Sequence, residues 1–313
     1  MLGALMEAVE SHHAEGFAAE TRVCAWADLP QGERSLAPDD FASRRDALAA
    51  GDRVAWTAAR RLDGGLLWVP FEGVSLDLRH RGDIRIERSS NGQAAHFDVD
   101  AACTAALLEV LERDALAVWM NLPQDRRASD RIAIGAIPFE WLQRLCGAGR
   151  EAGLIFALYA LPSLLRLPAF LAEIIDLEAG AAHRRVVYGT ACHPKLEGAL
   201  AGAVLEAAQS RAAAIAGARD DLLYRAPSGG GFGVAPPLPP HMAPRSWSAA
   251  ASGFDESAPA DLPALAAALA RAGYPQTAFV DLAAPDASVS VVKAFAPGLG
   301  AFERRRRKAV ERS

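Results

Sequence analysis

Residues 91–121 read NGQAAHFDVDAACTAALLEVLERDALAVWMN, a polar, glycine-containing loop that runs into a long apolar helix. In its middle, the helix carries Glu109, Glu112 and Arg113. The two carboxylates lie three residues apart and therefore share one helical face, with the guanidinium one turn beyond Glu109. A helix that is apolar on nearly every side is expected to be buried, and buried carboxylates require a cation.

A second helix, expected over residues 2–20, repeats this spacing with Glu7 and Glu10. Four carboxylates and one arginine would leave excess negative charge if they shared a buried site. Mg²⁺ prefers oxygen ligands, and the phosphates of a bound nucleotide would complete its coordination. The residue types leave two interpretations open: a Mg-nucleotide site, or two ordinary helix faces in which Glu109 and Arg113 form a solvated i, i+4 pair.

The composition is that of an ordinary globular protein, with 51% hydrophobic and 23% charged residues in a chain of 313. A net charge of −5 offers no basic field, so no nucleic-acid partner is expected. Four scattered cysteines without metal-ligand spacing are typical of a reducing compartment. The most apolar run, residues 154–165, is too short to span a bilayer, and the N-terminus lacks a signal-peptide pattern. We therefore expect a cytoplasmic protein without a membrane partner.

Several common nucleotide-binding and hydrolase motifs are absent from the sequence. It contains no GxxxxGK[ST] P-loop, no GxGxxG dinucleotide fingerprint and no GxSxG nucleophile elbow. The sequence therefore predicts neither a P-loop nor a dinucleotide-binding fingerprint.

Helical and strand patterns along the chain predict a fold of the α/β class. The long helix is expected over residues 98–121, with Asp98 or Asp100 as its cap. Two strands are expected to form a hairpin around the turn at residues 63–65. Further helices are expected at 39–49, 139–147, 194–216 and 261–272, and strands at 21–26, 53–59, 66–71, 84–88, 131–137, 153–160, 184–190, 277–282 and 289–295.

Two segments are expected to lack regular structure. Residues 226–259 are rich in Gly, Pro and Ser and predict a loop, either a lid or a simple connection. Residues 303–313 form a charge run that predicts a solvated tail, with a polyanion contact as the alternative.

Four motifs together resemble the YcaO family. LLEVLERDA at 107–115, preceded by NGQAA at 91–95, resembles the central signature of that family. EAAQSRAAAIAGARDDL at 206–222 is similar to its Glu-Ala-x-Gln-x-Arg helix, and ALMEAVE at 4–10 to its first Glu-x-x-Glu helix. VVKAFAPGLG at 291–300 resembles its closing strand and turn. The matches follow the family order and cover nearly the whole chain, so an unrelated helical scaffold would require four ordered coincidences.

The resemblance implies an enzyme that uses ATP and Mg²⁺ to activate peptide backbone amides. A nucleophile adds to the amide carbonyl, the resulting oxygen attacks the γ-phosphate, and phosphate leaves; the products are azolines or thioamides. The implied fold is one α/β domain over residues 1–313, with mixed sheets covered by helices and ATP between helices. The implied partners are a peptide or protein substrate and a TfuA-like or activating-enzyme-like protein, and a homodimer is allowed. The endings GARDDL and VVKAFAPGL are most similar to the TfuA-associated subgroup.

The resemblance also assigns roles to individual residues of this sequence. Its metal-binding positions correspond to Glu7, Glu10, Glu109 and Glu112. Its nucleotide-binding positions correspond to Arg113, Gln209 and Arg211.

The sequence departs from the family pattern just before the second carboxylate pair. Ala101 stands where the family usually has a further metal-binding Glu, with Asp100 beside it. Phe97 stands where an Asn is usual, and Ala94 replaces a small hydroxyl residue. The usual N-terminal segment containing Gly and Lys is missing, so the chain is expected to be N-terminally short. These departures support an alternative function, a non-catalytic family member that binds a peptide or a partner protein.

Overall fold

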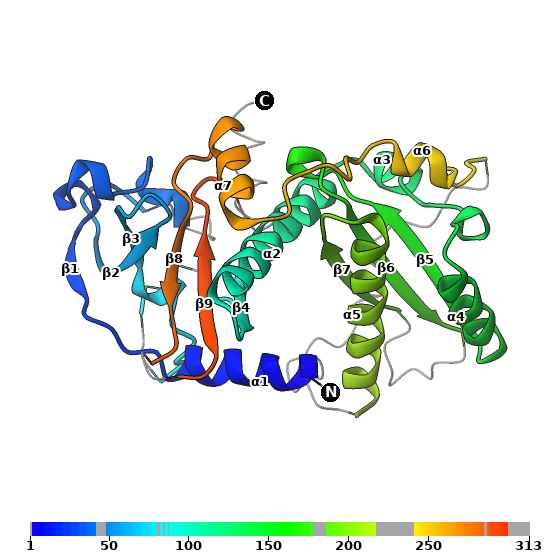
Figure 1. Ribbon diagram of the computed structural model, residues 1–313, viewed down its shortest axis with the longest axis horizontal. Coiled ribbons are helices and arrows are strands. Elements are labelled where there is room, and N and C mark those ends of the chain that lie inside the picture. The colour runs from blue at the N-terminus through cyan, green and yellow to red at the C-terminus, as the bar shows by residue number, and fades with distance from the viewer. Residues whose placement is uncertain are drawn as a thin grey trace. The chain divides into compact units, whose positions relative to one another are not determined.

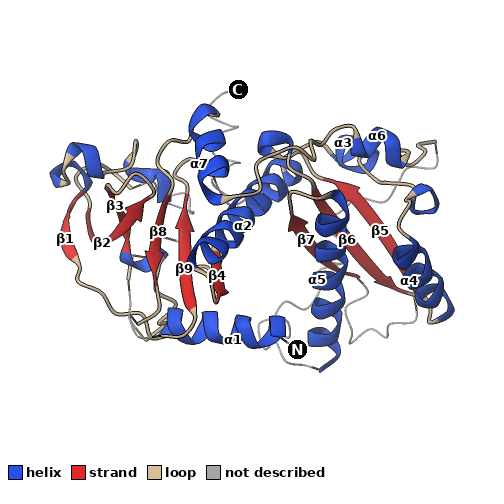
Figure 2. Ribbon diagram, in the orientation of Figure 1, coloured by secondary structure: helices blue, strands red, loops and turns tan. Residues whose placement is uncertain are grey.

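The computed structural model in Figure 1 describes most of the chain: residues 2–41, 48–79, 82–83, 85–86, 88–177, 186–216, 241–284 and 287–299. The chain divides into two compact units. The first unit comprises Met1–Ala117 and Pro259–Ser313, and the second comprises Val118–Ala258. Both units combine helices with antiparallel sheet, so the predicted α/β class is confirmed (Figure 2). Within the described residues, none of the helices combines the length and the apolar character needed to cross a bilayer.

The first unit is built on one antiparallel sheet with the order β1-β2-β8-β9-β4, in which β3 also pairs with β2. Its strands are β1 (Arg22–Ala25), β2 (Arg53–Arg61), β3 (Leu66–Pro70), β4 (Gln93–His96), β8 (Ala278–Asp281) and β9 (Ser290–Phe295). The β2–β3 hairpin is confirmed, and its turn contains Gly64 with a φ of +83°, a value that glycine adopts readily. Short 3-10 helices lie at Trp26–Asp28, Gln31–Glu33, Pro38–Phe41 and Phe71–Gly73.

Three helices belong wholly or mainly to the first unit: α1 (Leu2–Glu15), α2 (Val99–Met120) and α7 (Leu262–Arg271). The prediction of a helix over 98–121 is confirmed by α2. Asp98 is its cap, because Asp98 Oδ1 accepts a hydrogen bond of 2.8 Å from the Ala101 N–H. Helix α1 ends five residues earlier than expected, before Gly16.

Helix α2 approaches the start of β4 closely at Gly92. This residue has a φ of +78°, and a Cβ atom there would lie 2.8 Å from Val110 Cγ2 and 2.9 Å from the Ala294 carbonyl oxygen. Both the backbone conformation and the available space therefore require glycine. This close approach places Val110, the residue next to Glu109, against the start of β4.

The second unit contains a three-stranded antiparallel sheet with the order β5-β6-β7. The strands are β5 (Leu154–Ala160), β6 (Ala169–Asp176) and β7 (Val186–Cys192). The helices are α3 (Gln124–Ser129), α4 (Glu140–Glu151), α5 (Leu196–Ala216) and α6 (Trp247–Ala251), with short 3-10 helices at Ile134–Ala136 and Leu164–Arg166.

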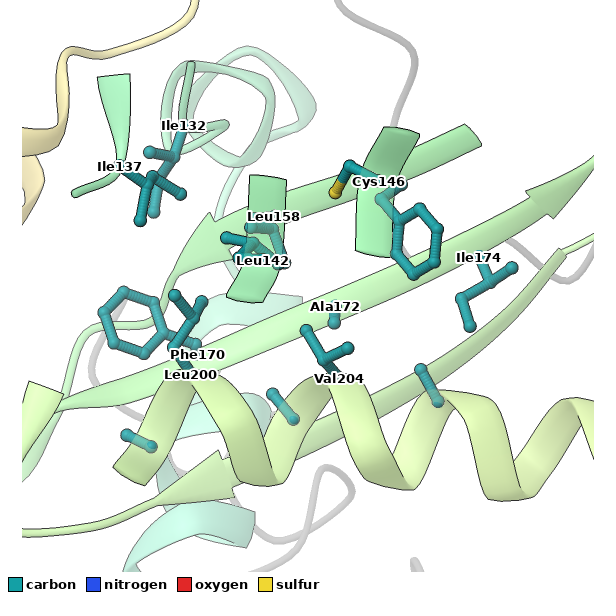
Figure 3. Packing of buried hydrophobic residues seen from close by; sticks show 14 of the residues in the cluster. Ile132, Ile137, Leu142, Cys146, Leu158, Phe170, Ala172, Ile174, Leu200 and Val204 are labelled. Carbon is teal, nitrogen blue, oxygen red and sulfur yellow. The ribbon is translucent and has the colours of Figure 1, made fainter. Parts of the chain in front are cut away.

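One face of this sheet forms the core of the second unit. Phe170, Ala172 and Ile174 are alternate residues of β6 and therefore point to the same face. They belong to one buried cluster with Leu142 of α4 and Val204 of α5 (Figure 3). Both helices thus cover the same side of the sheet.

Three further expectations differ from the structure. The loop expected between residue 91 and the long helix contains strand β4, which pairs with β9. The strand expected at 131–137 is replaced by two isolated bridges, at Arg131 and Ile132, and a 3-10 helix. The segment 226–259 is described from residue 241, and there it includes helix α6, whose first turn is capped by Ser246. The tail at 303–313 and most of the helix expected at 39–49 lie outside the described residues.

Candidate functional site

Glu10 is tied to the edge of the first sheet. Helix α1 packs against β4 and β9, and the half-buried Glu10 side chain accepts a hydrogen bond of 2.8 Å at Oε1 from the Ala95 N–H. Because β4 is an edge strand, this N–H points away from β9 and is satisfied by a side chain. Glu7, one turn earlier on α1, is exposed.

The electrostatics of Glu10 place further carboxylates nearby. The pKa of Glu10 is raised from an ordinary value of 4.5 to about 7, chiefly by burial; the Ala95 hydrogen bond lowers it, and the charges of Glu109 and Glu7 contribute to the rise. A like charge acts on a pKa in this way only at short range. Glu109 of α2 and Glu7 of α1 therefore lie within electrostatic range of Glu10, although the two helices are far apart in sequence.

The raised pKa of Glu10 predicts a pH dependence of stability for the metal-free protein. Glu10 keeps its proton up to about pH 7 when folded but loses it near pH 4.5 when unfolded. The folded state binds more protons in that window, so its contribution to the free energy of unfolding should fall as pH rises from 4.5 to about 7. Glu10→Gln should remove this contribution. Thermal melts of both proteins in a chelator across this range measure it; identical pH profiles would contradict the raised pKa of Glu10.

The second carboxylate pair surrounds Arg113 on α2. Arg113 Nη2 lies 3.6 Å from Glu109 Oε1, and Arg113 Nε lies 3.5 Å from Glu112 Oε1. Glu112 is 9% exposed, whereas Glu109 and Arg113 are about one quarter exposed at their side chains. The guanidinium thus lies near both carboxylates, and the helix spacing predicts the contact with Glu109, four residues away.

The remaining two predicted residues lie on α5 in the second unit. Gln209 is exposed, and Arg211 Nη2 is 2.8 Å from Asp176 Oδ2 at the end of β6. Their assignment to the same site as the four carboxylates stays a prediction. On the same helix, the structure shows a contact of Glu206 that the sequence did not predict: its Oε2 accepts a 2.7 Å hydrogen bond from the Thr190 N–H of β7. Glu206 is the first residue of the EAAQSR motif. Its hydrogen bond could not be read from the sequence, because it depends on β7 lying at the edge of the sheet, where the Thr190 N–H meets a side chain.

The positions that depart from the family pattern are also placed. Ala94 is buried in β4, and Phe97 is 68% exposed in the short connection to α2. Asp100 lies exposed in the first turn of α2, beside Ala101. With Asp98 serving as the cap, Asp100 is a first-turn residue that projects to solvent.

The donor set fits a divalent cation bound together with further oxygen ligands. Carboxylate oxygens are the ligands that Mg²⁺ prefers, and a cation would relieve the repulsion that raises the pKa of Glu10. In the part of the chain that the structure describes, no group of three or more His, Cys, Asp or Glu side chains is arranged so that it could hold a metal ion by itself. Mg²⁺ normally keeps water or substrate phosphates in its shell, so an open arrangement suits it.

Comparisons with known protein sequences identify relatives. The family model described as "YcaO cyclodehydratase, ATP-ad Mg2+-binding" matches residues 1–300. A Rhizobium leguminosarum bv. trifolii protein named "Uncharacterized protein in tfuA 3'region" is 31% identical over 239 residues, covering 72% of this chain and 55% of that protein. A Mycobacterium tuberculosis protein is 29% identical over 233 residues, covering 71% and 49%. The chain spans about half the length of these curated relatives.

Solved structures share the fold. A "Heterocyclase in complex with substrate and Cofactor" has a TM-score of 0.74 and 19% identity, covering 95% of this chain and 43% of that one. "The structure of YcaO from Methanopyrus kandleri bound with AMPPCP and Mg2+" has a TM-score of 0.66 and 20% identity, covering 98% and 77%. The E. coli microcin synthetase McbBCD complex with pro-MccB17 bound has a TM-score of 0.62 and 15% identity, covering 95% and 78%. At these identities the likeness concerns the fold alone.

Proposed function

The chain belongs to the YcaO family, and from this premise we propose that it activates peptide backbone amides with ATP and Mg²⁺. The substrate would be a ribosomally made peptide or a protein. The matching family model and the heterocyclase fold support a role in ATP-dependent peptide modification.

One observation of the structure carries the proposal. The half-buried Glu10 has a raised pKa, chiefly because of burial, and the charges of Glu109 and Glu7 add to the rise, as expected for carboxylates near one another without a cation. Helices α1 and α2 contribute these groups, and the edge strand β4 holds Glu10 through Ala95. A Mg²⁺ ion that carries nucleotide phosphates would neutralise the group.

Each predicted residue has a role in this proposal. Arg113 lies beside Glu109 and Glu112, and its planar guanidinium group would donate hydrogen bonds to phosphate oxygens. When bound, Mg-ATP would supply the phosphoryl group that turns the amide oxygen into a leaving group. The proposed metal-binding set is Glu7, Glu10, Glu109 and Glu112, and the proposed nucleotide-binding set is Arg113, Gln209 and Arg211.

A calorimetric titration tests the nucleotide site directly. Purified protein titrated with Mg-ATP is expected to release or absorb heat with one binding isotherm, and EDTA is expected to abolish it because the phosphates bind through the metal. Titration with ATP in EDTA is the matched control. Absence of heat at millimolar Mg-ATP would sink the proposal.

A second candidate function rests on the residues next to the site. Phe97, 68% exposed, and Ala94 and Ala101 offer no metal or phosphate ligand through their side chains. A family member without turnover could still bind a peptide or a partner protein here. The calorimetric result distinguishes the two candidates.

The product and partner follow from the same proposal. The name of the Rhizobium relative places that protein in a tfuA region, which supports a TfuA-like partner and thioamidation for this chain. Azoline formation with an activating-enzyme-like partner is the alternative product chemistry. A cytoplasmic location and a homodimer remain predictions.

A further inference from the structure

A buried lysine lies behind the strand that holds Glu10. Lys293 of β9 is 3% exposed and pairs in register with Gln93 of β4 on one side and with Val280 of β8 on the other. Lysine is almost never fully buried unless its ammonium group has partners. Its place in the sheet interior therefore points to a specific contact.

That contact is with the turn at residues 89–92. Lys293 Nζ donates a hydrogen bond to the Ser89 carbonyl oxygen. Within the same turn the Asn91 N–H donates to Ser89 Oγ at 3.1 Å, and the Gln93 N–H donates to the Ser90 carbonyl oxygen at 3.0 Å. The ammonium group thus holds the first carbonyl of a compact turn from inside the protein.

The turn at 89–92 is connected to both helices' carboxylates, Glu10 of α1 and Glu109 of α2. At its end, the Gly92 carbonyl oxygen accepts a 2.8 Å hydrogen bond from the Ala294 N–H, which sets β4 on β9. Three residues later, the Ala95 N–H holds Glu10. Val110, the neighbour of Glu109 on α2, lies so close to Gly92 that a Cβ atom at Gly92 would be 2.8 Å from Val110 Cγ2. A shift of this turn would therefore move Glu10 and Glu109 relative to each other.

We infer that Lys293 is a positioning residue for the Mg-ATP site, an inference that rests on the proposed function. It acts through the Ser89 carbonyl and the turn at 89–92, which keep β4 and α2 at the separation that the shared cation requires. Lys293 itself stays in the sheet interior and touches neither metal nor nucleotide.

The test compares Mg-ATP binding by wild type and Lys293→Met, which keeps a long apolar side chain but removes the ammonium group. We expect the calorimetric Kd for Mg-ATP to rise about tenfold, as for other residues that orient metal ligands. In peptide-dependent ATP hydrolysis, the KM for ATP should rise similarly, whereas kcat should change by less than about twofold, because the groups around the transferred phosphate are unchanged.

The matched control is Val280→Ala, at a buried apolar residue of β8 that pairs in register with Lys293. It should lower the melting temperature and leave the Kd for Mg-ATP unchanged. Should Lys293→Met fail to fold, Lys293→Gln, which keeps a neutral donor too short to reach Ser89, takes its place. Wild-type affinity in the lysine variant, or an equal loss of affinity in Val280→Ala, overturns the inference. A wild type that binds no Mg-ATP overturns the proposed function itself.

Discussion

Replacing Glu109 with glutamine is expected to abolish peptide-dependent ATP hydrolysis while leaving the fold intact. Glutamine has the size of glutamate but lacks the charge that a Mg²⁺ ion requires from its ligand. Metal coordination supplies several kcal/mol of charge stabilisation in phosphoryl transfer, so turnover should fall by about 100-fold or more. Phosphate release at saturating ATP and peptide measures the loss.

The stability of the Glu109→Gln protein should remain close to that of wild type. Glu109 and Arg113 form an i, i+4 pair at 3.6 Å that is about one quarter exposed, and such pairs contribute about 0.5 kcal/mol or less. Unfolding monitored by circular dichroism checks this. An activity loss with an unchanged melting temperature would assign Glu109 to the chemistry.

A matched control lies on α4. Glu140 and Arg144 form another i, i+4 pair, at 3.0 Å, with side chains 82% and 70% exposed. Glu140→Gln removes the same charge from the same kind of pair and should leave ATP turnover unchanged. Unchanged turnover in Glu109→Gln, or an equal loss in both variants, would contradict the assignment of Glu109 to the metal.

The largest loss of stability is expected from Gly189→Ala in β7. A Cβ atom at Gly189 would lie 2.2 Å from the Ala207 nitrogen and 2.5 Å from the Ala203 carbonyl oxygen of α5. Both are backbone atoms, so the whole helix must move away from the sheet. Overpacking of this kind costs about 3 kcal/mol or more in the free energy of unfolding. Urea denaturation followed by circular dichroism measures the change.

Gly147→Ala is the control for Gly189→Ala. Gly147 lies inside α4, and a Cβ atom there would meet nothing within 4 Å. The same substitution should therefore stabilise the protein by about 0.5–1 kcal/mol, because alanine favours the helix. If Gly189→Ala were as stable as wild type, the close contact between α5 and β7 described here would be wrong.

Long periodic segments were the most predictable parts of the fold. The apolar pattern of residues 98–121, with an Asp before it and a proline after it, predicts α2 within two residues. The β2–β3 hairpin follows from Asp-Gly-Gly between two apolar runs. Both signals are local, because a cap or a turn involves residues that are neighbours in sequence.

Strand β4 was missed for the opposite reason. Gln93–His96 contains no β-branched residue and no alternating pattern, so nothing local favours a strand. Its conformation comes from pairing with β9, which lies at the other end of the chain. Likewise, α6 forms in a segment whose composition predicts a loop; there Trp247 stacks against Phe170 at a ring separation of 5.9 Å.

The sequence alone determined which residue types are available and which of them share a helix face. Glu7 with Glu10, and Glu109 with Glu112 and Arg113, follow from the spacing of 3.6 residues per turn. Only the tertiary structure decided that Glu10 of α1 is held at the edge strand β4, within electrostatic range of Glu109 of α2. The Ala95 N–H donates a hydrogen bond to Glu10, which is 85 residues away in sequence, and Lys293 donates one to the Ser89 carbonyl oxygen, which is 204 residues away. Such contacts depend on which backbone groups a sheet leaves unpaired, and no local pattern encodes that.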